Sequence, residues 1–357
     1  MPAKRIEMST SEHQDVAIVG GGIVGLAVAW RAARQGLRVV LHERGQHFGA
    51  ETSHVAAGML APVTEADAGE PELLALGRDS AARWPAFAAE LEADAELGVG
   101  YRACGTLVVA RDRDEAEALE RERALRETLG LAVTPLLPSA ARRLEPALAP
   151  TLRAALDVPG DHAVDPRLVC AALVRACERA GVELRRGSEI TDPAALGAER
   201  VVLAAGPWSG TFGDEPRVRP VKGQSLRLRD PQGPGLLERV VRYDGGYLVP
   251  RGDGRYVLGA TVEERGFDTT MTAGAIYELL RDAGELVPGV LELEVEEALA
   301  GLRPGTPDNA PVIGPSRADP RVVWATGHFR NGVLLTPITA ELVLDALAGK
   351  AMAEVPA

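Results

Sequence analysis

A glycine-rich turn between two β-prone stretches constrains this chain more than any other feature. The segment DVAIVGGGIVGLAVAWRAARQGLRVVLHER predicts a strand over residues 16–19, a turn, a helix and a second strand over residues 37–41. Within the turn, Gly20, Gly22 and Gly25 have the spacing GxGxxG. This order is typical of a βαβ unit, in which helices cover a parallel sheet.

Each part of this unit has a role in holding a dinucleotide. Gly20 permits the tight turn, Gly22 lets the backbone approach a pyrophosphate, and Gly25 allows close packing of the helix. The helix N-terminus offers free N–H groups to phosphate. Glu43, at the end of the second strand, can accept hydrogen bonds from ribose hydroxyls. A glycine-rich turn in some other α/β fold is the alternative, and it leaves Glu43 unexplained.

The turn does not distinguish NAD from FAD, but the segment ETSHVAAGMLAP favours FAD. A nicotinamide-binding domain would usually continue into another βα unit. Here small residues, among them Thr52, Ser53, Ala57 and Gly58, predict a loop that can lie flat against a large cofactor. The alternative is a plain connection between elements.

The remaining pattern predicts an α/β fold with two domains. Helices are expected over residues 73–97, 166–180 and 273–286 and in the charged run RDRDEAEALERERALRETLG, and strands over 182–185, up to Gly206 and over 321–327. Residues 218–260 are typical of an antiparallel sheet, and EVEEALAGLRPGTPDNAPVIGPS is expected to cross back as a proline-rich loop. We predict a discontinuous Rossmann-type FAD-binding domain (14–82, 150–212 and 297–350), an α+β substrate domain (83–149 and 213–296) and a disordered extension (1–13).

Three predicted strands end in glycine turns, near Gly20, Gly206 and Gly327. Ligands lie beyond the carboxyl ends of parallel strands, so these turns should border one crevice. A helix predicted to begin near Gly332 would point its N-terminus into that crevice, where it would favour negative charge on a reduced flavin.

Composition excludes other classes of function. The formal charge of -12 argues against nucleic acid and anionic membranes as partners. The longest apolar run, residues 16–30, is shorter than the about 20 residues that span a bilayer. Three cysteines without CxxC spacing, and a polar start without a signal peptide, favour a reducing cytoplasm. The six histidines, among them His42, His47 and His54, show no metal-ligand spacing, so no metal is expected.

The motifs taken together resemble the D-amino-acid oxidase superfamily of FAD enzymes, and within it the glycine oxidases of thiamine biosynthesis. The matching pieces include VAIVGGGIVGLAVAW, TSHVAAGMLAP, VVLAAGPWSG, YLVPR, GLRPGTPDNAPVIG and GHFRNGVLLTPITAELV. The resemblance implies FAD as the cofactor. Together with the glycine turn, it gives as FAD-binding residues Gly20, Gly21, Gly22, Gly25, Glu43, Arg44, Thr52, Ser53, Ala57, Gly58, Met59, Ile190, Gly206, His328, Phe329, Arg330, Asn331, Gly332, Val333 and Leu334.

The same resemblance implies a site for a small amino acid. Arg303 matches the arginine that binds the substrate carboxylate, Tyr247 a tyrosine that also reaches it, and Arg330 an arginine at the substrate end of the flavin. A surface salt bridge on a loop is the alternative for Arg303. Val262 stands where relatives carry a larger methionine, which leaves the size of the pocket open. GLRPGTPDNAP holds no cysteine for covalent attachment, so noncovalent FAD is expected.

The resemblance implies an oxidase that removes a hydride from the α-carbon of glycine, sarcosine or a small D-amino acid. O2 would give hydrogen peroxide, and no side chain would act as acid or base. The product dehydroglycine would supply the thiazole of thiamine. The alternatives are a dehydrogenase that passes electrons to a carrier and a flavin-binding subunit without turnover. The resemblance also implies a homo-oligomer, although the sequence itself shows no interface.

Overall fold

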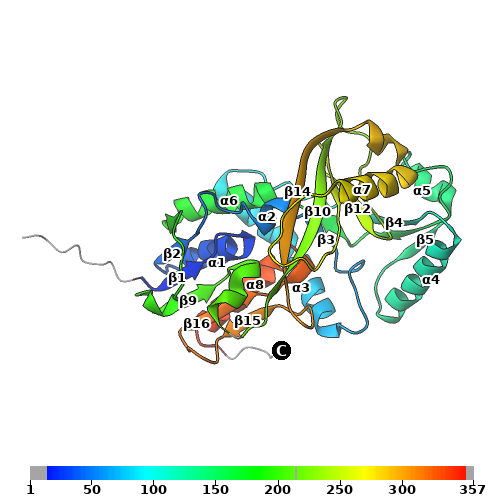
Figure 1. The fold of residues 1–357 in the computed structure, drawn as a ribbon. Helices are drawn as coiled ribbons and strands as arrows, with labels where there is room; N and C mark the ends of the chain where they lie inside the picture. The colour runs from blue at the N-terminus through cyan, green and yellow to red at the C-terminus, as the bar shows by residue number, and fades with distance from the viewer. Residues whose placement is uncertain (1–13, 214, 351–357) are drawn as a thin grey trace, which may run out of the picture.

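The fold is built on two large sheets that lie side by side (Figure 1). The computed structural model describes residues 14–213 and 215–350; the extension predicted as disordered, residues 1–13, lies outside them. The six-stranded sheet occupies the left of Figure 1 and the eight-stranded sheet the right. The long strands β10 and β14 are the edge of the eight-stranded sheet that lies nearest the six-stranded one. This arrangement confirms the predicted α/β class.

The six-stranded sheet has the order β15-β16-β9-β1-β2-β8, and every pair is parallel except β15 with β16. Its strands are β1 (Val16–Val19), β2 (Val39–His42), β8 (Glu183–Arg185), β9 (Arg200–Leu203), β15 (Val312–Pro315) and β16 (Val322–Thr326). Helix α1 (Ile23–Arg34) packs against α6 (Pro166–Arg179) and α8 (Thr336–Leu347), and α3 (Pro71–Ala95) covers both of these. The central strand β1 is wholly buried, as the continuous apolar run of a parallel strand requires.

The turn between β1 and α1 depends on glycine. Gly20 has a φ of 110°, in the left-handed region that glycine adopts without strain. A Cβ at Gly25 would overlap the carbonyl oxygen of Gly20, so only glycine lets the first turn of α1 lie so close to the end of β1. This close approach is the role predicted for Gly25.

The eight-stranded sheet has the order β14-β10-β13-β12-β11-β4-β6-β5. Its strands are β4 (Thr106–Ala110), β5 (Thr134–Leu136), β6 (Ala154–Val158), β10 (Arg219–Arg229), β11 (Val240–Tyr243), β12 (Gly246–Pro250), β13 (Arg255–Gly259) and β14 (Glu294–Gly305). All pairs are antiparallel except β11 with β4. Helix α7 (Ala273–Leu286) packs on β10, β12 and β13, while α4 (Arg113–Thr128) packs on β4 and β6 and α5 (Pro138–Leu144) on β5 and β6.

Short elements join the two sheets. Helix α2 (Thr52–Val55) precedes the two-stranded ribbon of β3 (Met59–Leu60) and β7 (His162–Ala163). The 3-10 turns are η1 (Pro193–Ala195), η2 (Gly206–Phe212), η3 (Pro288–Glu292) and η4 (Phe329–Asn331). Both α2 and η4 lie where the two sheets meet, since each contacts β14.

Two predictions from the sequence are wrong in detail, and the two sheets divide the chain at positions other than the predicted domain boundaries. The proline-rich loop is in part the strand β14, which pairs with β10 along its whole length; Pro304 is tolerated because β14 is an edge strand. The helix predicted to begin near Gly332 begins at Thr336, after η4 and a turn. Strand β6 and the end of β14 belong to the eight-stranded sheet, although the predicted boundaries at residues 150 and 297 assign them to the FAD-binding domain.

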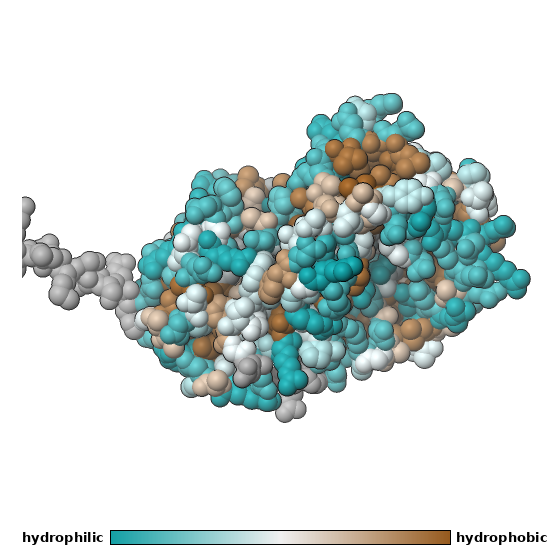
Figure 2. Space-filling model, in the orientation of Figure 1, coloured by the Kyte–Doolittle hydropathy of each residue, from teal (hydrophilic) through white to brown (hydrophobic). Residues whose placement is uncertain are grey.

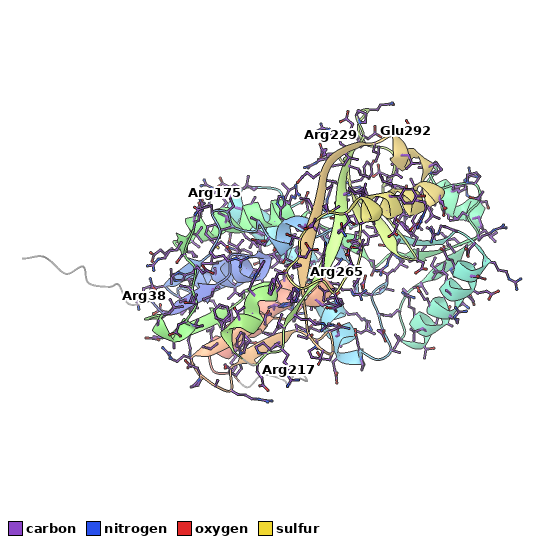
Figure 3. The ribbon with its side chains drawn as sticks, viewed as in Figure 1. Arg38, Arg175, Arg217, Arg229, Arg265 and Glu292 are labelled. Carbon is purple, nitrogen blue, oxygen red and sulfur yellow. The ribbon has the colours of Figure 1, made fainter. Side chains whose placement is uncertain are left out.

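The surface seen in Figure 2 is mostly hydrophilic, and Arg38, Arg175, Arg229 and Glu292 project from its periphery (Figure 3). One hydrophobic group of atoms lies over the region of α7 and η3. Exposed apolar side chains of this region are Tyr277, Leu291 and Val295. Among the described residues, no helix has the length and apolar character needed to cross a membrane.

Candidate active site

A cavity of about 710 Å³ lies at the carboxyl ends of β1, β2, β9 and β16 and extends to β10, β12 and β14. This volume is in the range of cofactor and ligand sites. The cavity is lined by the predicted residues Gly20, Gly21, Gly22, Glu43, Arg44, Thr52, Ser53, Ala57, Gly58, Met59, Ile190, Gly206, Tyr247, Arg303, His328, Phe329, Arg330, Asn331, Gly332 and Val333. The turns after Gly20, Gly206 and Gly327 therefore do border one crevice.

Two predicted cofactor residues lie outside this lining. Gly25 packs against the backbone of Gly20, as described above, and so shapes the turn from behind. Leu334 is buried, and its carbonyl oxygen accepts hydrogen bonds from the Ser80 hydroxyl at 2.7 Å and the Trp84 indole N–H at 2.9 Å. Leu334 thus faces α3, because the turn before α8 directs it away from the crevice.

The nucleotide end of the cavity is organised by backbone amides. The Glu43 carboxylate accepts hydrogen bonds from the N–H of Gly21 at 2.8 Å and of Gly45 at 2.7 Å, so it ties β2 to the glycine turn. The Ser53 hydroxyl accepts from the N–H of Ile23 at 3.0 Å, at the start of α1. A glycine turn, a helix N-terminus and an acid at the end of β2 are the groups that hold a dinucleotide in this type of fold.

An aromatic and cationic stack stands beside this end. The Arg44 guanidinium lies 3.6 Å from the centroid of the Trp208 ring, and Phe267 stacks on Trp208 with the ring centroids 5.9 Å apart. Arg44 also pairs with Glu51 at 3.3 Å. Trp208 lines the cavity but is absent from the predicted site residues, although it lies in the matching motif VVLAAGPWSG, of which only Gly206 is predicted to bind FAD.

The other end of the cavity carries Arg303 on β14. Its guanidinium donates only to backbone carbonyls, those of Thr261 at 3.1 Å and Lys222 at 3.3 Å, and within residues 14–213 and 215–350 no carboxylate forms an ion pair with it. A Cβ at Gly223 would lie 2.5 Å from two of its nitrogens, so glycine on the neighbouring strand makes room for it. Arg303 therefore lies on a strand and bonds backbone carbonyls, whereas the alternative interpretation expected a surface salt bridge on a loop.

Tyr247 lines the same end from β12. Burial raises the pKa of its hydroxyl above the ordinary value, against the opposing effect of the nearby Arg303. The hydroxyl therefore stays protonated at neutral pH and can donate a hydrogen bond to an anionic ligand.

Arg330 is held by an acid that is not among the predicted site residues. Glu65 accepts a hydrogen bond from Arg330 at 3.0 Å and also bonds Arg242. Burial opposes ionisation of Glu65, but Arg242 and Arg330 outweigh it and lower the pKa of this carboxyl. All three line the cavity, and together with Arg303 they place three guanidinium groups and one carboxylate at this end of it. No motif marks Glu65 or Arg242, because their pairing joins segments far apart in the chain.

His328 is buried at the crevice, and its Nε2 lies 2.9 Å from the Thr339 hydroxyl. Burial lowers its pKa to about 4, so the folded protein keeps it neutral.

The buried His328 should make the stability of the protein depend on pH. Between pH 6.5 and 4 the unfolded chain binds a proton at this residue that the folded chain does not, so stability falls as the pH falls. We expect a loss of about 3 kcal/mol over this window. Chemical denaturation at pH 7 and pH 5 should show a smaller difference for His328→Asn than for the wild type; equal differences would contradict this.

Comparison with known proteins agrees with this geometry. A family model described as FAD dependent oxidoreductase (DAO) matches residues 15–346. The chain belongs to this family. It is thus an FAD-dependent oxidoreductase, and the crevice with its glycine turn is the part of the structure that suits FAD.

Individual relatives are similar along nearly the whole chain. A glycine oxidase of Geobacillus kaustophilus (strain HTA426) is 34% identical over 95% of this chain and 94% of its own. The bifunctional protein ThiO/ThiG of Trichormus variabilis is 34% identical over 93% of this chain, which spans 52% of that longer protein. The structure also resembles the crystal structure of glycine oxidase from Geobacillus kaustophilus, with a TM-score of 0.89 over 96% of this chain and 96% of that one.

Proposed function

We propose that this protein is an oxidase that converts glycine or another small amino acid, such as sarcosine or a small D-amino acid, to its imine. The observation that carries the proposal is Arg303, a cation at the end of the FAD cavity without an ionic partner among the described residues. A guanidinium in this state suits a carboxylate, which it can bind with two parallel hydrogen bonds. The similarity to glycine oxidases supports the choice of substrate class.

In this proposal the chain positions the substrate and FAD supplies the chemistry. When bound, FAD would supply the acceptor for a hydride from the α-carbon, and O2 would then take up two electrons and two protons to give hydrogen peroxide. Arg303 and Tyr247 bind the carboxylate, which fixes the direction of the Cα–H bond. Arg330 and Arg242 add positive charge that favours an anionic substrate. The hydride leaves once the substrate amine has lost its proton to water, and the imine is then hydrolysed to the oxo acid and ammonia, so no side chain is needed as acid or base.

The size of the substrate depends on Val262, which lines the cavity with 63% of its surface exposed. Within the thiamine pathway, the product from glycine would be dehydroglycine for the thiazole ring, which the similarity to a ThiO/ThiG protein supports.

We also propose that FAD is bound noncovalently, that the protein acts in the cytoplasm and that it forms a homo-oligomer. Acid precipitation followed by flavin absorbance, and light scattering, test the first and last of these.

The central experiment is anaerobic titration of the FAD-bound protein with glycine, sarcosine, D-alanine and L-alanine. We expect the flavin absorbance to bleach with one or more of the first three and to remain with L-alanine. Peroxide formation in air then distinguishes an oxidase from a dehydrogenase, which would reduce dyes readily and O2 slowly. Flavin that stays oxidised with every amino acid would end the proposal.

A further inference from the structure

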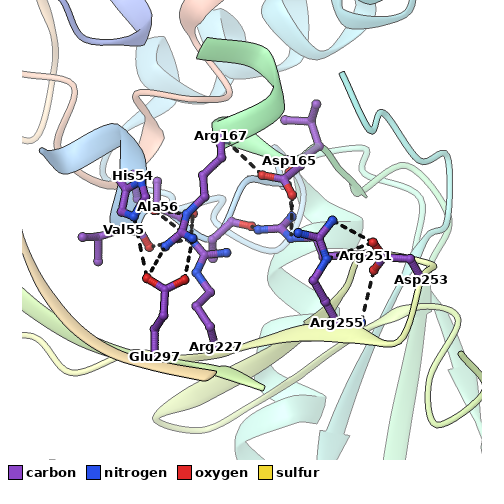
Figure 4. A network of polar contacts seen from close by, with 12 residues as sticks. His54, Val55, Ala56, Asp165, Arg167, Arg227, Arg251, Asp253, Arg255 and Glu297 are labelled. Atoms are coloured by element: carbon purple, nitrogen blue, oxygen red, sulfur yellow. Dashed lines mark hydrogen bonds and ion pairs between the residues drawn. The ribbon is translucent and has the colours of Figure 1, made fainter. Parts of the chain in front are cut away.

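Three arginines converge on one short stretch of backbone beside the cavity (Figure 4). Arg227 on β10 donates from Nη2 to the carbonyl oxygens of His54 at 2.9 Å, Ala56 at 3.1 Å and Val55 at 3.4 Å. The Arg167 Nε donates to the His54 carbonyl at 3.0 Å. Arg251 donates to the carbonyls of Ala57 at 2.8 Å and Val164 at 2.7 Å.

These carbonyls need partners because α2 is a single helical turn. The last carbonyl groups of a helix have no donor within it, and the negative end of its dipole favours a nearby cation. One guanidinium, that of Arg227, satisfies three consecutive carbonyls at this end. The bonds fix the backbone where α2 passes into the segment that lines the cavity, Ala57 to Met59.

The guanidinium of Arg227 is surrounded by carbonyl groups, whereas those of the neighbouring arginines lie beside carboxylates. Arg167 forms a two-bond ion pair with Glu297 at 2.6 and 3.1 Å, and the Nε of Arg251 lies 3.7 Å from a carboxylate oxygen of Asp165. Arg227 is only 6% exposed and, among the described residues, has no carboxylate within ion-pair distance. Burial lowers its pKa to about 9, which keeps it charged at neutral pH. Carbonyl dipoles of residues 54–56 therefore stabilise this buried cation.

The same segment is fixed at its other end by hydroxyl groups. The Thr52 hydroxyl donates to the carbonyl of Leu302 at 2.7 Å, one residue before Arg303 on β14. Ser53 accepts from the N–H of Ile23 at the start of α1. Residues 52–58 therefore connect the nucleotide turn, the strand of Arg303 and the arginine cluster, and a shift of this segment would alter both ends of the cavity.

We propose that Arg227, supported by Arg167 and Arg251, is a positioning residue that sets the backbone of residues 54–58 against FAD. It acts through the carbonyl groups and does not touch the substrate. The inference rests on FAD binding and not on the identity of the amino acid. If no amino acid reduced the flavin, the proposed oxidase activity would be refuted but the role of Arg227 would not. The role of Arg227 is refuted only by the measurements of FAD binding below.

The test is FAD binding to apoprotein, with Arg227→Met against Arg255→Met. Methionine keeps much of the apolar stem and removes the donors. We expect Arg227→Met to weaken FAD binding about tenfold or more, to speed hydrogen exchange of the amides in residues 54–58 and to shift the visible bands of the FAD that still binds. Arg227→Lys, which keeps the charge, should recover part of the affinity. Arg255 belongs to the same cluster but bonds Asp253, so Arg255→Met should bind FAD like the wild type.

An Arg227→Met apoprotein that binds FAD within about twofold of the wild type, with unchanged exchange at residues 54–58, would overturn the proposal. Equal weakening in Arg255→Met would do so as well, because it would mean that general loss of charge is responsible. If Arg227→Met does not give soluble protein, Arg227→Lys and Arg167→Met decide by the same titration. Wild-type affinity in both would then refute the role.

Discussion

Replacing Arg303 by methionine is expected to lower kcat/KM for glycine by about 10²- to 10³-fold. The substitution removes the charged fork that faces the cavity and leaves the substrate carboxylate with the weaker donor Tyr247. The two backbone carbonyls that Arg303 now satisfies, on Lys222 and Thr261, are next in sequence to the lining residues Gly223 and Val262, so water in the vacated space can bond them. Peroxide formation at several glycine concentrations, with anaerobic flavin reduction, measures the loss.

Two controls identify the cause of that loss. FAD affinity should be unchanged in Arg303→Met, because the glycine turn and Glu43 lie at the opposite end of the cavity. Arg303→Lys keeps a cation without the fork and should give an intermediate rate. An Arg303→Met protein that oxidises glycine at the wild-type rate would show that the carboxylate binds elsewhere.

The second large effect is expected at Gly25. In Gly25→Val a branched side chain would overlap the carbonyl oxygen of Gly20, in the turn before α1, and approach the side chain of Ala204, which follows β9. Helix α1 would have to move away from β1, which should cost about 3 kcal/mol or more and misplace the helix N-terminus that faces the nucleotide. We expect little FAD-bound protein and a clearly lower melting temperature of the apoprotein.

Gly274→Ala is the matched control for this substitution. Gly274 is also a helical glycine, in α7, but it is exposed, and a Cβ added to it would meet no atom within 4 Å. Alanine there should be neutral or stabilise by up to about 1 kcal/mol, since it lowers the entropy of the unfolded chain. A Gly25→Val protein as stable and as rich in FAD as Gly274→Ala would contradict the packing argument.

The nucleotide half of the fold could be predicted because its signals are local. The β1, α1 and β2 pattern lies within one short segment, and the helices of residues 166–180 and 273–286 carry clear periodicity. Strand β14 could not, because its residues become a strand only through pairing with β10, far away in the chain. The same reason explains why the boundaries at residues 150 and 297 cut across the eight-stranded sheet.

The site divides in the same way. Arg303, Arg330 and Tyr247 lie in motifs that resemble a family, and the structure brings all three to one cavity. Glu65 and Arg242 have no such motif, and their positions follow from contacts between distant segments. The sequence predicts Arg330 as a positive charge beside the flavin, and the structure adds Glu65, which neutralises part of that charge. Local sequence motifs therefore identify the residues expected to bind the ligand. The charged residues that pair with them, such as Glu65, can be identified only from the folded chain.

The order of strands in the six-stranded sheet also bears on how the protein matures in the cell. Strand β16 lies next to β9, and residues His328 to Val333 line the crevice, so the cofactor site is incomplete until the chain has been synthesised as far as Val333. Pairing over such sequence distances is slow and leaves strand edges open in the meantime. FAD can therefore stabilise only chains that already include Val333, and shorter nascent chains stay open to aggregation and proteolysis whatever the supply of FAD.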